Sequence, residues 1–170
     1  MTDFFELAEN RYSVRKYKAQ PVEPEKIARI LDAGRLAPTA HNNQPQRIKV
    51  ITAADELEKM DICTRCRFGA PAALLICYDK DAVWTRPFDG ADSGEVDSSI
   101  ITTFMMMEAQ QLGLGSCWVM YFDPAKTKEQ FDLPENIVPV AFLPLGYPAD
   151  DAEPSPMHGK RFALADTLLK

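Results

Sequence analysis

The sequence lacks an apolar run long enough to cross a membrane. Its longest mainly apolar stretches, 71–78 and 137–146, are about half the roughly 20 residues that a spanning helix needs. It also lacks an excess of basic side chains, because 19 Lys and Arg face 25 Asp and Glu and give a net charge of −6. A bound anion must therefore be held by a local basic cluster. We expect neither a membrane nor a nucleic acid as partner.

Metal-binding side chains are scarce as well. There are two histidines, His41 and His158, and four cysteines, of which Cys63 and Cys66 have CxxC spacing. A structural zinc site needs a second pair of ligands at recognisable spacing, and none is present, so we predict no metal site. The first residues are acidic and do not form a secretory signal, so we expect a cytoplasmic protein with free thiols.

Common catalytic motifs are also missing. The Gly113-Leu114-Gly115 step begins like a dinucleotide-binding loop, but Trp118 stands where the third glycine belongs, and a predicted helix precedes it instead of a strand. The sequence has no Walker A, HExxH or GxSxG motif. We therefore predict no catalytic nucleophile and no nucleotide-binding Rossmann loop.

The 170 residues, 46% of them hydrophobic, suit a single globular domain over 1–170. Apolar periodicity predicts helices over 3–10, from 24 to before Pro38, after a cap at Thr52 to about 65, over 97–112 and over 124–131. It predicts strands over 47–51, 72–78 and 138–145, and a strand or extended segment over 117–122. Pro139 and Pro144 place the last strand at an edge or give it a bulge. This order predicts an α+β fold with one sheet, with a surface loop over 79–95.

Four short segments stand at the ends of these predicted elements. They are Arg11-Tyr12-Ser13-Val14-Arg15, the stretch 37–45 (APTAHNNQP), the stretch 113–119 (GLGSCWV) and the stretch 144–148 (PLGYP). In this order, over nearly the whole chain, they resemble the nitroreductase family of flavin-dependent oxidoreductases. The resemblance implies an α/β sandwich with a central, mostly antiparallel sheet flanked by helices, in an intertwined homodimer. It also implies FMN bound without a covalent bond at the dimer interface.

The resemblance assigns cofactor-binding roles to both ends of the chain. Arg11, Ser13 and Arg15 alternate, so an extended backbone points all three to one face, where they suit a phosphate and the flavin pyrimidine edge. The alternative is a solvated basic turn. Lys160 and Arg161 resemble the family's basic pair at the phosphate, and which of the two makes the contact stays open, as does a plain basic tail.

Two further segments match residues that lie along the flavin ring in the family. The first is the partner-side segment, with Pro38, Thr39, Ala40, Asn42 and Gln44. Its amides offer the donors and acceptors that a ring edge requires, although turn chemistry around Pro45 explains them too. His41 in its variable position faces either substrate or solvent. The second is Trp118, Val119 and Met120, whose backbone would run along the ring; the alternative is a buried core strand.

The implied function is an FMN-dependent oxidoreductase. It would pass a hydride from NADH or NADPH through flavin N5 to a small-molecule acceptor, namely a nitroaromatic, a quinone or an unsaturated metabolite, in a ping-pong cycle. No catalytic side chain is needed, because the flavin carries the chemistry. The alternative is a protein that stores or senses FMN without turnover, with the 79–95 loop as a lid over the substrate side.

Overall fold

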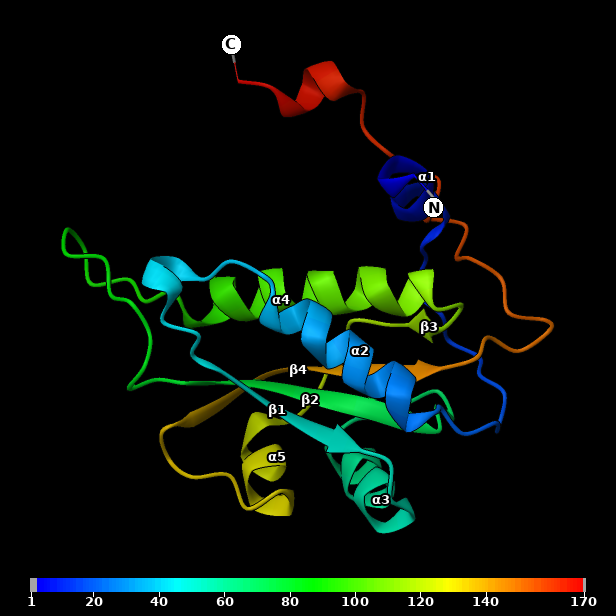
Figure 1. Cartoon of the computed structure of the whole chain (residues 1–170), viewed down its shortest axis with the longest axis horizontal. Coiled ribbons are helices and arrows are strands. Elements are labelled where there is room, and N and C mark those ends of the chain that lie inside the picture. The colour runs from blue at the N-terminus through cyan, green and yellow to red at the C-terminus, as the bar shows by residue number, and fades with distance from the viewer. Residues whose placement is uncertain (1–2, 170) are drawn as a thin grey trace.

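The computed structural model describes residues 3–169, which form a four-stranded sheet with helices on both faces (Figure 1). The elements in chain order are α1 (Phe4–Asn10), α2 (Pro24–Arg35), η1 (Ala40–Asn42), β1 (Gln46–Ile51), α3 (Ala54–Cys63), β2 (Ala72–Asp79), α4 (Gly94–Gln111), β3 (Gly115–Ser116), α5 (Pro124–Gln130), β4 (Ile137–Gly146) and η2 (Leu164–Thr167). The α+β class and the antiparallel sheet are thus confirmed. Among the described helices, none is long and apolar enough to cross a membrane.

The sheet has the order β1-β2-β4-β3, with antiparallel pairing throughout. Strand β4 lies between β2 and β3, so the expectation of an edge strand is wrong and the expectation of a bulge is confirmed. Ile76 pairs with Ala141 whereas Cys77 pairs with Pro139, which leaves Val140 as the extra residue. The bulge puts Pro139, which has no backbone N–H, where the regular ladder is already interrupted.

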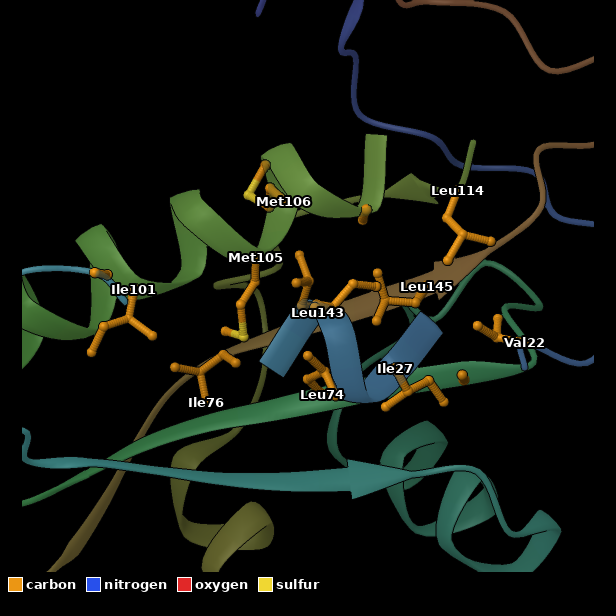
Figure 2. Close-up of a cluster of buried hydrophobic side chains, with 14 residues drawn as sticks. Val22, Ile27, Leu74, Ile76, Ile101, Met105, Met106, Leu114, Leu143 and Leu145 are labelled. Carbon is orange, nitrogen blue, oxygen red and sulfur yellow. The ribbon is translucent and has the colours of Figure 1, made fainter. Parts of the chain in front are cut away.

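Helices α2 and α4 cover one face of the sheet, and α3 and α5 cover the other (Figure 1). Figure 2 shows the first interface, where side chains from α2 and α4 meet those of β2 and β4. Its buried members include Ile27, Ile101, Met105, Leu74, Ile76, Leu143 and Leu145. The two helices approach closely at Gly34, because a Cβ there would lie 2.8 Å from Met105 Cγ. Most of the apolar faces predicted by helical spacing therefore point into this core, whereas Phe104, also predicted on the apolar face of α4, is 42% exposed.

Two predicted helix starts differ from the structure. The helix expected to follow a Thr52 cap begins at Ala54, with Ala53 at the N-cap position and no side-chain cap. Helix α4 begins at Gly94, three residues before the expected start. Glycine is needed at this position because a Cβ would collide with the Tyr78 ring. The surface loop between β2 and α4 therefore covers 80–93.

The segment 117–122 is extended but does not form a continuous strand. After Ser116, the Cys117 N–H donates to the Pro144 carbonyl at 3.4 Å, but proline has no N–H to complete the pair. The chain rejoins β4 only at Val119, which forms an isolated bridge with Phe142. Within 117–122 the expected strand is thus reduced to this one bridge, and the regular strand β3 ends just before it, at Ser116.

Candidate functional site

The segment 11–15 is fixed along β3, at the C-terminal end of α4. The Val14 N–H donates to the Ser116 carbonyl at 3.0 Å, and the Val14 side chain is buried. Gly115 makes this approach possible, since a Cβ there would lie 2.5 Å from Val14 Cγ2. Because alternate side chains of an extended segment point to opposite sides, inward Val14 turns Ser13 and Arg15 outward.

A hollow of about 240 Å³ opens on this outward side. Its lining residues are Arg11, Tyr12, Ser13, Arg15, Ser155, Met157, His158 and Arg161. The structure thus brings the three predicted residues near the N-terminus together with Arg161 from the C-terminal segment. Lys160 is exposed and does not line this hollow.

Tyr12 and His158 were not predicted from the sequence. The Tyr12 hydroxyl donates to the Ala152 carbonyl at 3.3 Å, and its ring meets His158 edge-on with centroids 6.2 Å apart. These contacts hold the 152–161 segment over the hollow. No local signal could have found them, because they join positions about 140 residues apart in the sequence.

The arginines of this hollow have uncompensated charge. Neighbouring Lys16 forms an ion pair with Asp151 at 2.7 Å, and Lys18 forms one with Asp150 at 2.5 Å. Within residues 3–169, the guanidinium groups of Arg11, Arg15 and Arg161 have no carboxylate partner. Arg15 Nη1 donates only to the Ser13 carbonyl, at 3.3 Å, and Arg161 Nη1 donates to backbone carbonyls. Three such groups around one hollow suit a phosphate-like anion.

The buried Cys117 thiol lies close to this cluster. Burial raises the pKa of Cys117 above its ordinary value, and the guanidinium of Arg15 and the hydroxyl of Ser13 offset only part of this rise. The thiol therefore stays neutral at physiological pH. It adds no negative charge that would compensate the arginines, and it is not an activated nucleophile.

The predicted backbone strip, Trp118 to Met120, comes soon after β3 in the chain. The Val119 N–H donates to the Phe142 carbonyl at 2.9 Å, and the Phe142 N–H donates back at 3.0 Å. Because consecutive backbone groups of an extended chain point in opposite directions, those of Trp118 and Met120 point away from β4. Val119 is buried, as the core-strand alternative requires, whereas the Met120 side chain is 64% exposed.

Met120 borders a second hollow, of about 540 Å³, that sequence reasoning missed. It lies between the C-terminal end of α3 with the two residues that follow it, 61–65, and the residues 120–123. The Thr64 hydroxyl donates to the Tyr121 carbonyl at 2.5 Å, and the Arg65 guanidinium lies 5.0 Å from the Tyr121 ring centroid. The Trp118–Met120 strip is therefore next to a hollow whose lining includes an aromatic ring and a guanidinium group.

The segment 38–44 lies at the other end of α4. The Ala40 N–H donates to Asp97 Oδ1 at 2.9 Å, near the helix start, and the Gln44 N–H donates to Thr39 Oγ1 at 3.1 Å. His41, Asn42 and Gln44 have positive φ values of 52°, 55° and 51°. Non-glycine residues adopt this conformation at a cost of roughly 1–3 kcal/mol each, often at functional sites. The side chains of Asn42 and Gln44 are exposed.

The two predicted halves of the site are therefore far apart within one chain (Figure 1). Asp97 contacts the segment 38–44, whereas Gln111 ends α4 just before β3 and the segment 11–15. At 1.5 Å per residue, Asp97 and Gln111 are about 21 Å apart along the helix axis. One chain unites Arg11, Ser13, Arg15 and Arg161 beside the backbone strip, but it does not bring them to the segment 38–44.

Comparisons with known proteins identify close counterparts of this sequence and fold. The profile described as the Nitroreductase family matches residues 8–65 and 62–147. A nitroreductase family protein from Clostridium difficile 630 has 43% identity and a TM-score of 0.92, over 99% of this chain and 98% of that one. An FMN-dependent nitroreductase from Clostridium difficile R20291 has 26% identity and a TM-score of 0.73, over 92% and 96%. An Archaeoglobus fulgidus protein, provisionally named NADH dehydrogenase/NAD(P)H nitroreductase, is 31% identical over 162 residues, 90% of either chain.

Proposed function

Because the chain belongs to the nitroreductase family, whose members here include NAD(P)H- and FMN-dependent enzymes, we propose that it uses FMN to reduce a small organic acceptor with NADH or NADPH. The acceptor classes that suit this chemistry are nitroaromatics, quinones and unsaturated metabolites. The observation that carries the proposal is the uncompensated arginine cluster around the 240 Å³ hollow.

The residues of this hollow fit the monophosphate of FMN. Arg11, Arg15 and Arg161 supply charge-assisted donors, and the Ser13 hydroxyl supplies another donor. Asp150 and Asp151 beside them are already paired with Lys18 and Lys16, so these two carboxylates leave the arginine charge available. FMN fits better than FAD because the cluster is built for one terminal phosphate and the sequence has no dinucleotide-binding loop.

The chain's own residues would bind and orient the cofactor. When bound, FMN supplies a ring that accepts a hydride at N5 from NADH or NADPH and donates electrons to the acceptor in a second half-reaction. The outward backbone groups of Trp118 and Met120 would lie along this ring and direct a donor toward N5. Asn42 and Gln44 would meet the ring edge through their amides. No protein side chain is required as a nucleophile.

We propose that each complete site takes residues from two chains of a homodimer. The segments 11–15 and 38–44 lie at opposite ends of α4 in one chain, farther apart than one FMN molecule spans. The C-terminal segment also leaves the body of the molecule (Figure 1) and carries Phe162, 86% exposed, and Leu164, 76% exposed. A second copy would cover these apolar side chains and bring its own segment 38–44 to the arginine cluster.

The proposal is tested with Arg11→Ala and Arg15→Ala, with Lys16→Ala as the matched control. A charge-assisted hydrogen bond contributes roughly 1.5–3 kcal/mol, so each arginine variant should bind FMN about 10- to 150-fold more weakly. Lys16 is paired with exposed Asp151, so its loss should change FMN affinity by less than about threefold. Fluorescence titration of the apoprotein gives the affinities.

Different results would overturn different parts of the proposal. Extraction of FAD, or no flavin binding after reconstitution, would refute the cofactor assignment. Equal FMN affinity in all three variants would refute the arginine cluster as the phosphate site. FMN binding without oxidation of NADH or NADPH in the presence of a nitroaromatic or a quinone would favour the alternative, an FMN store or sensor.

A further inference from the structure

A buried carboxylate stands behind the segment 38–44. The Asp97 side chain lies near the start of α4, and only 2% of the residue is exposed. Its Oδ1 accepts from the Ala40 N–H at 2.9 Å, and its Oδ2 accepts from the Ser93 hydroxyl at 2.7 Å. A buried carboxylate is tolerated only where hydrogen bonds replace water, and both oxygens of Asp97 have such partners.

Ser93 extends this network to the 80–93 loop. The Trp84 N–H donates to Ser93 Oγ at 3.2 Å, and the Ser93 N–H donates to the Trp84 carbonyl at 2.9 Å. The Trp84 ring in turn stacks on the His41 ring, with centroids 5.5 Å apart and planes 20° from parallel. Asp97 is therefore the junction between α4, the 80–93 loop and the segment 38–44.

The segment held by this junction has an unfavourable backbone. His41, Asn42 and Gln44 are left-handed, and such conformations persist in non-glycine residues only where the surroundings fix them. Within the segment, Thr39 Oγ1 accepts the Gln44 N–H at 3.1 Å, but this bond does not attach the segment to the rest of the molecule. The bond from Ala40 to Asp97 does, because it reaches a buried side chain on the longest helix.

We propose that Asp97 is a positioning residue for the flavin site. Without touching FMN, it holds the left-handed backbone that presents the Asn42 and Gln44 amides to the ring edge. The inference rests on the proposed function and deepens it, because it assigns the placement of the Asn42 and Gln44 amides to Asp97, a residue outside the segment 38–44. Asparagine at this position keeps an acceptor for the Ala40 N–H and a group that can bond to Ser93, whereas alanine keeps neither.

The experiment compares Asp97→Ala, Asp97→Asn and Glu95→Ala. Glu95 is exposed in the same first turn of α4, so its variant removes an equivalent charge from the helix N-terminus without touching the segment 38–44. Loss of a hydrogen bond to a buried charged group predicts about 10- to 100-fold weaker FMN binding for Asp97→Ala. Asp97→Asn should recover most of this affinity, and Glu95→Ala should match the wild type.

Two readouts separate positioning from general destabilisation. The inhibition constant of inorganic phosphate, measured as a competitor of FMN, should stay unchanged in Asp97→Ala because the arginine cluster lies at the other end of α4. The visible absorption and circular dichroism bands of bound FMN should shift, because the amides at the ring edge move. A variant that merely loosened the fold would weaken phosphate and FMN together.

Ser93→Ala provides a second route if Asp97→Ala does not fold. It removes one of the two hydrogen bonds to the carboxylate and should weaken FMN binding about 3- to 10-fold. Wild-type FMN affinity and spectra in both Ser93→Ala and Asp97→Ala, or in Ser93→Ala where alanine is not tolerated at 97, would overturn the inference alone. A wild-type protein that binds no FMN would overturn the proposed function, and this inference with it.

Discussion

The two-chain site makes a quantitative prediction for heterodimers. One variant, Arg11→Ala with Arg15→Ala, loses the phosphate half of the site. A second, Asn42→Ala with Gln44→Ala, loses the amide half, which lies about 21 Å away along α4 in the same chain. In a heterodimer of these two variants, one site combines both intact halves and the other combines both damaged halves. Two differently tagged chains, expressed together and purified through both tags, give this species.

The expected occupancy follows from the hydrogen bonds that each variant loses. Two charge-assisted bonds contribute at least about 3 kcal/mol, a roughly 160-fold loss, and two neutral amide bonds contribute about 2 kcal/mol, a roughly 30-fold loss. At a free FMN concentration about ten times the wild-type Kd, intact sites should be about 90% filled. Sites with a damaged phosphate half should be about 6% filled, and sites with a damaged amide half about 25% filled. The heterodimer should thus carry about 0.45 FMN per chain, against about 0.16 if each chain held its own complete site.

A quadruple variant paired with a wild-type chain is the matched control. Both of its shared sites then have one damaged half, so it should carry about 0.16 FMN per chain, whereas separate sites would give about 0.45. Flavin absorbance against protein concentration measures both species. The two-chain model therefore predicts the higher value for the complementary pair and the lower value for the control. The reverse order would refute it, as would a monomer that binds FMN fully.

The remaining predictions concern thiols and acid. Burial raises the pKa of Cys77 to about 12, so iodoacetamide at pH 8 should modify it far more slowly than partly exposed Cys66 in the folded protein; equal rates by peptide mass spectrometry would contradict this. The Asn136 amide donates to Asp79 at 2.9 Å and helps to hold the pKa of that carboxyl below its ordinary value. A carboxyl group whose pKa is lowered by folding stabilises the protein at pH values above its ordinary pKa, and this stabilisation is lost on acidification. Asp79→Asn should therefore destabilise the protein at pH 7, and the difference from the wild type should fade below about pH 4. Urea unfolding at both pH values checks this, and a difference that grows on acidification would show the opposite linkage.

Much of the fold follows from local sequence patterns. Apolar residues at helical spacing, such as Ile27 and Ile30, already indicate which face of a helix enters the core. The alternation of Arg11, Ser13 and Arg15 indicates that the three point to one side, and the order of the four motifs indicates the family. These features depend on near neighbours in the chain, so a pattern of residue types is enough to read them.

The local rules fail where a distant segment changes the outcome. Pro144 suggested an edge strand, yet β4 is an interior strand that pairs with β3 only up to the point where the proline N–H is missing. Thr52 is a good capping residue by type, but α3 begins two residues after it. Propensity does not include these tertiary constraints, because it describes a residue and its near neighbours alone.

The composition of the candidate site was decided by the tertiary structure. Arg11 and Lys16 look alike as basic residues in the sequence. Only the fold brings Asp151 to Lys16 and leaves Arg11 with no carboxylate partner among residues 3–169. The path of the C-terminal segment likewise puts Arg161 in the hollow and leaves Lys160 outside it. Sequence alone determined which chemical groups are available. Which of them meet, and which charges remain uncompensated, depends on contacts between segments more than 130 residues apart, whose geometry is set by the packing of the whole sheet and its helices.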